Sequence, residues 1–227
     1  MNEPRVRAAA LIFDFDGLIL DTETPILAAW QAAYREHGCE LLMEQWQHAL
    51  GTANGFDPFA DLCRQTGLTL VREELLARIT ERNWAGCERQ PLLPGVVDVL
   101  DAADHMGLPA AVASSSSVAW LERWLGKHAI RRRFAAICGR DDVARVKPEP
   151  DLFLLAASRM GVPPERCIVF EDSPNGMRAA RRAGMRCVAV PNALTRQLAL
   201  PDPDLVVSSL AERPLHEILG QLGFAAA

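Results

Sequence analysis

Apolar runs that alternate with amphipathic stretches predict strands and helices in turn over most of this chain. Residues 9–13 (AALIF) are continuously apolar, which is typical of a strand buried on both faces of a parallel sheet. Five further apolar runs predict strands at residues 108–113, 134–138, 167–170, 187–190 and 205–207. The stretches between them predict helices at residues 94–106, 118–127, 151–160 and 174–184.

Residues 24–88 carry a different pattern, with helical periodicity and no convincing strand. Four amphipathic stretches predict helices at residues 26–37, 43–50, 58–66 and 71–87. Strand–helix alternation elsewhere implies right-handed crossovers and therefore a doubly wound parallel sheet. We expect an α/β fold in which residues 1–22 and 91–227 form a Rossmann-like core domain. An all-helical domain of residues 23–90 is inserted into the first crossover.

Composition places the chain among ordinary globular proteins and limits its partners. With 227 residues, 49% hydrophobic and 23% charged, the chain can bury a sizeable core and support a smaller accessory domain. The formal net charge of −5 provides no cationic field for nucleic acid or an anionic membrane, so neither is an expected partner. An anionic substrate must instead be bound by a local arrangement of donors.

The six cysteines are scattered without CxxC pairs. In a chain of this length they predict reduced thiols rather than a disulfide framework. The early apolar run at residues 8–13 is too short for a signal peptide or a membrane span. We therefore expect a cytoplasmic protein, as a monomer or a weak homodimer.

Polar side chains follow four of the predicted strands, where parallel sheets bind their ligands. They are Asp14 and Asp16 after the first strand, Ser114, Ser115 and Ser116 after the second, Lys147 in the loop after the third, and Glu171 and Asp172 after the fourth. Because the carboxyl ends of parallel strands share one edge of the sheet, we expect these side chains to gather there.

This set of side chains suits phosphoryl transfer. Clustered carboxylates repel one another unless a cation offsets them, and Mg²⁺ prefers such hard oxygen ligands. A lysine and hydroxyl groups can hold phosphate oxygens, and a carboxylate can act as the nucleophile. A second carboxyl group two residues on can protonate the leaving oxygen and later activate water.

Four segments resemble the motifs of the haloacid dehalogenase-like hydrolase superfamily, in its phosphatase and β-phosphoglucomutase-like branch. They are LIFDFDGLILDTE at 11–23, AVASSSS at 111–117, VKPEPDLF at 146–153 and VFEDSPNG at 169–176. All four motifs occur in the family's order. The helical block at 24–88 falls where the family inserts its cap domain.

The resemblance implies a role for each matching residue. Asp14 matches the nucleophile that forms an aspartyl-phosphate, and Asp16 matches the general acid and base. Ser114 matches the hydroxyl that contacts the phosphoryl group, with Ser115 and Ser116 as further candidate phosphate-binding residues. Lys147 matches the lysine that neutralises charge on the nucleophile and the phosphate.

The resemblance also implies the ligands of the metal ion. Asp172 matches a Mg²⁺ ligand, and Glu171 is its expected partner. The Asp14 carboxylate and the Asp16 backbone carbonyl complete the set of protein ligands.

These features predict a Mg²⁺-dependent phosphatase of a small phosphate monoester, such as a sugar phosphate. Carbon–halogen cleavage leaves no oxygen to protonate, so the second aspartate, Asp16, favours phosphoryl transfer. A sugar phosphate mutase is the alternative, but this chain departs from the family's mutase at two places. The mutase has a histidine near the position at which this chain has Ile26. It also has an arginine in the loop that corresponds to residues 50–54 (LGTAN), which contain none. A non-catalytic phospho-acceptor of the response-regulator type is the third alternative, but such modules are about half this length and have no inserted cap.

Several polar residues have plainer interpretations. Asp21 fits either a cap for the helix that follows or a supporting role in the site. Ser117 and Ser173 fit helix N-caps. The five histidines form no metal-ligand pattern, so we expect structural or surface roles for them.

Overall fold

The computed structural model of this protein describes residues 7–46 and 56–225. The chain divides into two compact units, one of Met1–Ile19 with Leu92–Ala227 and the other of Leu20–Pro91. The predicted cap loop at 50–54 and the last four residues of the predicted helix 43–50 lie outside the described residues.

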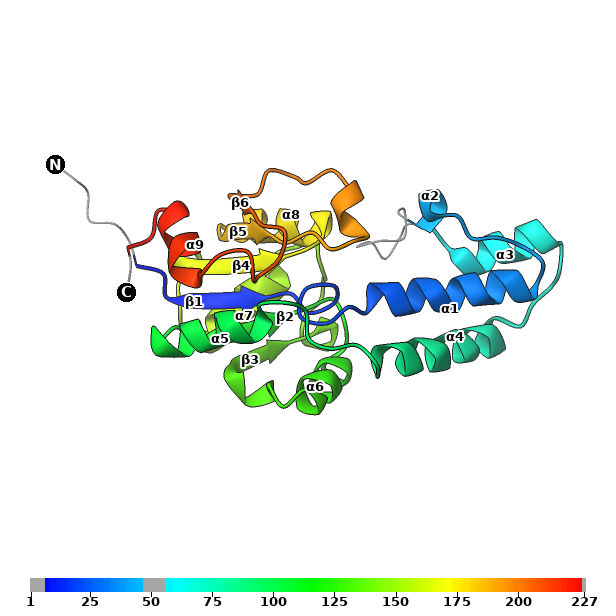
Figure 1. Ribbon diagram of the computed structural model, residues 1–227, viewed down its shortest axis with the longest axis horizontal. Coiled ribbons are helices and arrows are strands. Elements are labelled where there is room, and N and C mark those ends of the chain that lie inside the picture. The colour runs from blue at the N-terminus through cyan, green and yellow to red at the C-terminus, as the bar shows by residue number, and fades with distance from the viewer. Residues whose placement is uncertain (1–6, 47–55, 226–227) are drawn as a thin grey trace. The chain divides into compact units, whose positions relative to one another are not determined.

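The larger unit is built on a six-stranded parallel sheet with the order β3-β2-β1-β4-β5-β6 (Figure 1). The strands are β1 Ala10–Phe13, β2 Ala110–Ala113, β3 Phe134–Cys138, β4 Cys167–Glu171, β5 Arg186–Ala189 and β6 Leu205–Val206. The chain winds outward from β1 to β3 and then returns past β1 to continue with β4. The predicted doubly wound α/β fold is thereby confirmed.

Helices of the larger unit flank both faces of the sheet, and each of them except the last lies in a connection between two strands. They are α5 Val96–His105, α6 Val118–Lys127, α7 Asp151–Met160, α8 Pro174–Arg182 and α9 Leu215–Gln221. Single 3-10 turns occur at η1 Arg131–Arg133, η2 Arg140–Asp142, η3 Pro164–Arg166 and η4 Thr195–Gln197. Right-handed crossovers place α5 and α6 on one face and α7 and α8 on the other. Helix α9 was not predicted from the sequence.

The capping predictions hold at the residues that begin these helices. The Ser117 hydroxyl accepts a hydrogen bond from the Trp120 backbone amide at the start of α6. The Ser173 hydroxyl accepts one from the Gly176 amide at the start of α8. Both side chains satisfy amides that have no partner within the first helical turn.

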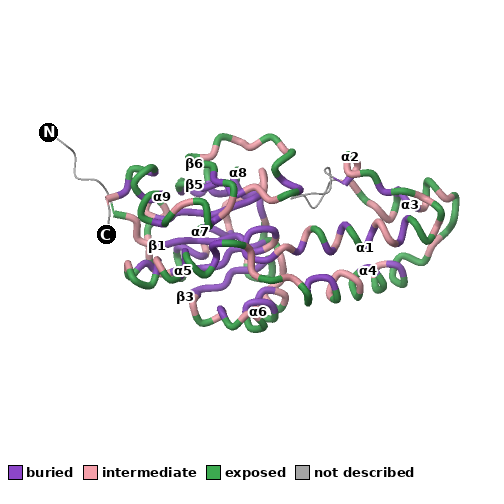
Figure 2. Tube along the Cα trace, viewed as in Figure 1, coloured by how far each residue is buried: buried purple, intermediate pink, exposed green. Residues whose placement is uncertain are grey.

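The core explains why the first predicted strand is continuously apolar. All residues of β1, β2 and β4 are buried (Figure 2). Ala10 and Ile12 belong to the cluster that packs under α7 and α8. The alternate residue Phe13 points to the opposite face, where its ring stacks on Phe170 with centroids 5.0 Å apart. Strands β1 and β4 are thus held side by side up to their carboxyl ends.

The smaller unit interrupts the connection between β1 and α5. Its described residues form four helices, α1 Glu23–Glu36, α2 Met43–Trp46, α3 Pro58–Thr66 and α4 Arg72–Cys87. Helices α1 and α4 pack against each other. The Tyr34 hydroxyl on α1 lies 2.9 Å from the buried Asp61 carboxylate on α3. At the start of α1, Asp21 accepts a hydrogen bond from the Thr24 amide, in agreement with a capping role.

None of the described helices is both long enough and apolar enough to cross a membrane.

Candidate active site

The buried side chain of Lys147 joins the ends of β1 and β4. Its Nζ lies 2.5 Å from Asp14 Oδ1 and 2.6 Å from Glu171 Oε1. Asp14 directly follows β1, and its backbone amide donates to Phe170 O at 3.0 Å, which continues the pairing of the two strands. The ammonium also lies 4.7 Å from the centre of the Phe153 ring on α7. The sheet therefore brings together a predicted nucleophile and its predicted cation.

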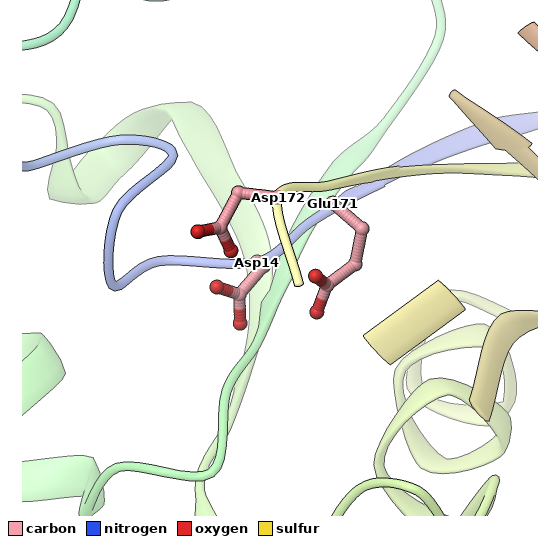
Figure 3. Close-up of side chains that lie close together, drawn as sticks. All are labelled: Asp14, Glu171 and Asp172. Atoms are coloured by element: carbon pink, nitrogen blue, oxygen red, sulfur yellow. The ribbon is translucent and has the colours of Figure 1, made fainter. Parts of the chain in front are cut away.

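Three buried carboxylates converge at this point. Asp14, Glu171 and Asp172 each present an oxygen within 4.8 Å of the others. Figure 3 shows Asp14 and Asp172 extending on one side of the end of β4 and Glu171 on the other. This separation follows from the alternation of consecutive side chains along a strand.

Burial and the neighbouring charges shift the pKa values of Asp14 and Lys147. Burial raises the pKa of Asp14 above its usual range; Lys147 offsets part of this, whereas Glu171 and Asp16 add to it. Burial by itself lowers the pKa of Lys147, but Asp14 and Glu171 outweigh it and raise that pKa above its usual value. The lysine therefore stays charged, and its ammonium pairs with two of the three carboxylates in this group, Asp14 and Glu171.

The donor set at this group fits a divalent cation. All the candidate ligands in it are carboxylate oxygens, which hard cations prefer over nitrogen or sulfur ligands. A bound cation would also offset the burial and the repulsion from Glu171 and Asp16 that together raise the pKa of Asp14. The buried acidic group can thus hold a metal ion.

Comparison with known proteins identifies the family to which this chain belongs. The family model described as haloacid dehalogenase-like hydrolase matches residues 11–190. This chain is a haloacid dehalogenase-like hydrolase. The resemblance drawn from the four motifs is confirmed, and with it the expectation of an enzyme. A non-catalytic phospho-acceptor is therefore set aside.

Individual relatives cover nearly the whole hydrolase. YhcW of Bacillus subtilis (strain 168) is 46% identical over 213 residues, which are 94% of this chain and 97% of YhcW. Fructose-1-phosphate phosphatase YqaB of Escherichia coli (strain K12) is 37% identical over 189 residues, 81% of this chain and 97% of YqaB. A crystal structure of mutant CbbY from Rhodobacter sphaeroides in complex with xylulose-(1,5)bisphosphate is 31% identical, with a TM-score of 0.75, covering 90% of this chain and 96% of that one.

The Asp16 carboxylate lies in a separate network of hydrogen bonds. Its Oδ2 accepts from Ser114 Oγ at 3.0 Å and from Ser116 Oγ at 2.6 Å. Its Oδ1 accepts from the indole Nε1 of Trp120 at 3.0 Å. The hydrolase thus brings Asp16, Ser114 and Ser116 together as the strand ends predict. Ser115 is exposed, and its contact with phosphate stays a prediction.

Glu171 binds two neighbours, Lys147 and the residue that begins α8. Its Oε2 accepts hydrogen bonds from the backbone amide of Ser173 at 2.7 Å and from the Ser173 hydroxyl at 3.0 Å. An acidic group at this end of a helix is also favoured by the helix dipole. Both oxygens of Glu171 are thereby engaged by protein donors.

Sequence reasoning missed three residues that shape the site. Trp120 holds Asp16, Asn192 contacts Asp172, and Gly176 makes room for Glu171. Asn192 follows the fifth predicted strand, so the rule about strand ends applied to that strand would have singled it out. Trp120 lies within a helix, and the sequence carries no comparable signal for it.

Gly176 permits the close approach of α8 to Glu171. A Cβ atom at this position would lie 1.6 Å from Glu171 Oε1. We expect Gly176→Ala to lower the free energy of unfolding by about 1–3 kcal/mol, because the buried carboxylate must shift to make room. Urea denaturation of the purified variant measures this change.

Gly126 in α6 provides the matched control. A Cβ atom added at this helical position would have no described neighbour within 4 Å, so Gly126→Ala should leave stability unchanged or raise it by up to about 1 kcal/mol. Equal stabilities for the two alanine variants would contradict the close packing of Glu171 on Gly176.

Proposed function

We propose that this hydrolase is a Mg²⁺-dependent phosphatase of small phosphate monoesters that works through an aspartyl-phosphate on Asp14. One observation carries the proposal: the Lys147 ammonium bridges Asp14 and Glu171, and Asp172 lies in the same buried group. A nucleophilic carboxylate, a fixed positive charge and candidate metal ligands are thereby combined at one sheet edge. Phosphoryl transfer needs little more than such positioning and charge stabilisation.

The proposed metal ligands are the carboxylates of Asp14 and Asp172 and the backbone carbonyl of Asp16. Glu171 lies in the group that can hold a metal ion, but its oxygens already accept hydrogen bonds from Lys147 and Ser173. We therefore assign to Glu171 the orientation of Lys147 and α8. When bound, Mg²⁺ would neutralise phosphate charge and let the anionic nucleophile approach the phosphorus.

In the first half of the reaction, a carboxylate oxygen of Asp14 forms a bond to phosphorus. The bond between phosphorus and the ester oxygen breaks, and that oxygen takes a proton from Asp16. The Lys147 ammonium stabilises the charge on the phosphoryl oxygens as it redistributes. The products of this step are the free alcohol and the aspartyl-phosphate.

In the second half, the ionised Asp16 takes a proton from water while the water oxygen bonds to phosphorus. The bond to Asp14 breaks and inorganic phosphate leaves. A Ser114 hydroxyl has one proton, so it donates either to Asp16 or to the phosphate. When the phosphate takes this hydrogen bond, Ser116 and Trp120 still hold Asp16 in place.

The substrate class that we propose is sugar phosphates and similar metabolites. Two relatives support it. YqaB is named a fructose-1-phosphate phosphatase, and the CbbY crystal structure holds xylulose-(1,5)bisphosphate. Hydrolysis is favoured over a mutase reaction because α1 has the half-buried Ile26 where the family's mutase has histidine. The second departure from the mutase, at residues 50–54, lies outside the described residues.

We also propose that the smaller unit acts as a cap that selects the substrate and excludes water.

We further propose that the protein is cytoplasmic. All six cysteines are free thiols, which supports this location.

A panel of phosphate esters tests the proposed function. We expect the purified protein to release phosphate from hexose, pentose or hexitol phosphates in Mg²⁺, to lose this activity in EDTA and to regain it with excess Mg²⁺. Phosphate release that is indifferent to the chelator would contradict metal dependence. NMR of a hexose 1-phosphate reaction distinguishes the products: free phosphate indicates hydrolysis, and the 6-phosphate indicates a mutase.

A further inference from the structure

Asn192 lies at the same sheet edge as the candidate metal ligands but belongs to none of the four motifs. It is in the segment that follows β5, three residues before η4. Strand β5 pairs with β4, so the end of β5 lies beside the residue that follows β4, Asp172. The position of Asn192 is therefore set by the sheet.

The carboxamide nitrogen of Asn192 links the ends of β4 and β1. Nδ2 lies 2.7 Å from Asp172 Oδ2 and 3.2 Å from the carbonyl oxygen of Gly17. Gly17 follows Asp16 in the turn after β1. One amide group thus ties a candidate metal ligand to the turn that carries the nucleophile and the general acid.

The orientation of this amide group is determined by its other end. Asn192 Oδ1 accepts hydrogen bonds from the backbone amides of Leu194 at 2.9 Å and Thr195 at 3.0 Å. Because these groups can only donate, the carbonyl oxygen must face them and the NH₂ group must face Asp172. The Asn192 backbone amide in turn donates to the hydroxyl of the buried Thr195 at 3.0 Å.

Gly17 provides the room that this arrangement requires. Its φ is +82°, and a Cβ atom there would lie 2.5 Å from Asn192 Nδ2 and 2.7 Å from Asp172 Oδ2. Both the backbone conformation and the close approach exclude an ordinary side chain. The turn, the amide and the carboxylate are thus packed as one unit.

We propose that Asn192 is a positioning residue that holds the Asp172 carboxylate in place for a divalent cation. The inference rests on the proposed function, in which Asp172 is a metal ligand. A hydrogen bond to Oδ2 restricts the rotation of the carboxylate, so less conformational freedom is lost when a cation binds. Partners of this kind typically change metal affinity by 10–100-fold.

Direct binding of metal to the full-length protein without substrate tests the proposal. Isothermal titration calorimetry with Mg²⁺ and EPR with Mn²⁺ measure the affinity of wild type and variants. We expect Asn192→Ala and Asn192→Ser to weaken binding by about tenfold or more. In kinetic assays the Mg²⁺ concentration for half-maximal activity should rise, while kcat at saturating Mg²⁺ should recover most of its wild-type value.

Two further comparisons separate positioning from a general effect on the loop. A serine at 192 can still accept a backbone hydrogen bond in the turn, but it is too short to donate to Asp172, so Asn192→Ser should keep near wild-type stability while losing affinity. Arg196 Nε donates to the Asn192 backbone oxygen at 3.2 Å, so Arg196→Ala alters the loop without touching the carboxamide and should bind Mg²⁺ as wild type does.

The outcomes distinguish this inference from the proposed function. Binding of Mg²⁺ by Asn192→Ser within twofold of wild type would overturn the role of Asn192, even if the protein is an active phosphatase. Conversely, a wild-type protein that binds Mg²⁺ in an Asn192-dependent manner but hydrolyses no phosphate ester would support the inference and refute the phosphatase.

Discussion

The Asp14→Asn variant is expected to lose phosphatase activity by on the order of 10⁴-fold or more, the scale seen when a covalent nucleophile is removed. An amide has the shape of the carboxylate but lacks its charge, so it cannot form the acyl-phosphate bond. Its weaker oxygen ligand also reduces metal affinity. Phosphate release in saturating Mg²⁺, measured with the best substrate from the ester panel, provides the test.

Stability measurements distinguish a lost nucleophile from a misfolded protein. Burial raises the pKa of Asp14, so replacing this carboxyl group by a neutral amide removes an unfavourable buried charge. The variant also loses the ion pair between Asp14 and Lys147, but the ammonium keeps its pair with Glu171, so the metal-free variant should unfold at a temperature close to that of wild type. Full activity in a folded Asp14→Asn variant would refute covalent catalysis at this residue.

The Lys147→Met variant is expected to lose both activity and stability. Without the ammonium, the transferring phosphoryl group loses the positive side chain beside Asp14, and kcat should fall by about 10²–10³-fold. Two buried carboxylates, Asp14 and Glu171, also lose their shared partner. Breaking such a buried pair from one side costs about 3–5 kcal/mol, which urea denaturation of the metal-free protein can measure.

Two controls accompany this variant. Lys127→Met changes the only other lysine of the chain, which is exposed at the end of α6, and should have little effect on activity or stability. Adding Glu171→Gln to Lys147→Met removes one unpaired charge and should restore part of the lost stability, but not kcat. Equal stability losses for Lys147→Met and Lys127→Met would contradict the buried ion pairs.

Most of the fold was predictable because strands and helices leave periodic patterns along the chain. The apolar run at residues 9–13 indicated a central strand, and β1 is indeed flanked by β2 and β4. Helix α9 was missed because its 7 residues span only about two turns, too few for a clear helical period. The single 3-10 turns were also not predicted, because three residues show no helical period. For the other elements within residues 7–46 and 56–225, the differences are one to three residues at element ends, where helices and strands fray.

The sequence by itself determined which chemical groups stand at the ends of the strands. Asp14, Ser114, Lys147 and Asp172 each follow a predicted strand or lie in its loop, and parallel strands end at one edge of the sheet. That rule depends only on strand order and direction, which local patterns and right-handed crossovers specify.

Only the tertiary structure decided which of these groups meet and which residues hold them in place. Ser114 and Asp16 are 98 positions apart in the chain, and Asn192 and Gly17 are 175 apart. These hydrogen bonds depend on side-chain rotamers and, for Asn192, on the close approach that Gly17 allows. Neither feature leaves a periodic signal in the sequence. The sequence therefore predicts the chemical groups of the site, and the packing of the folded core determines their geometry.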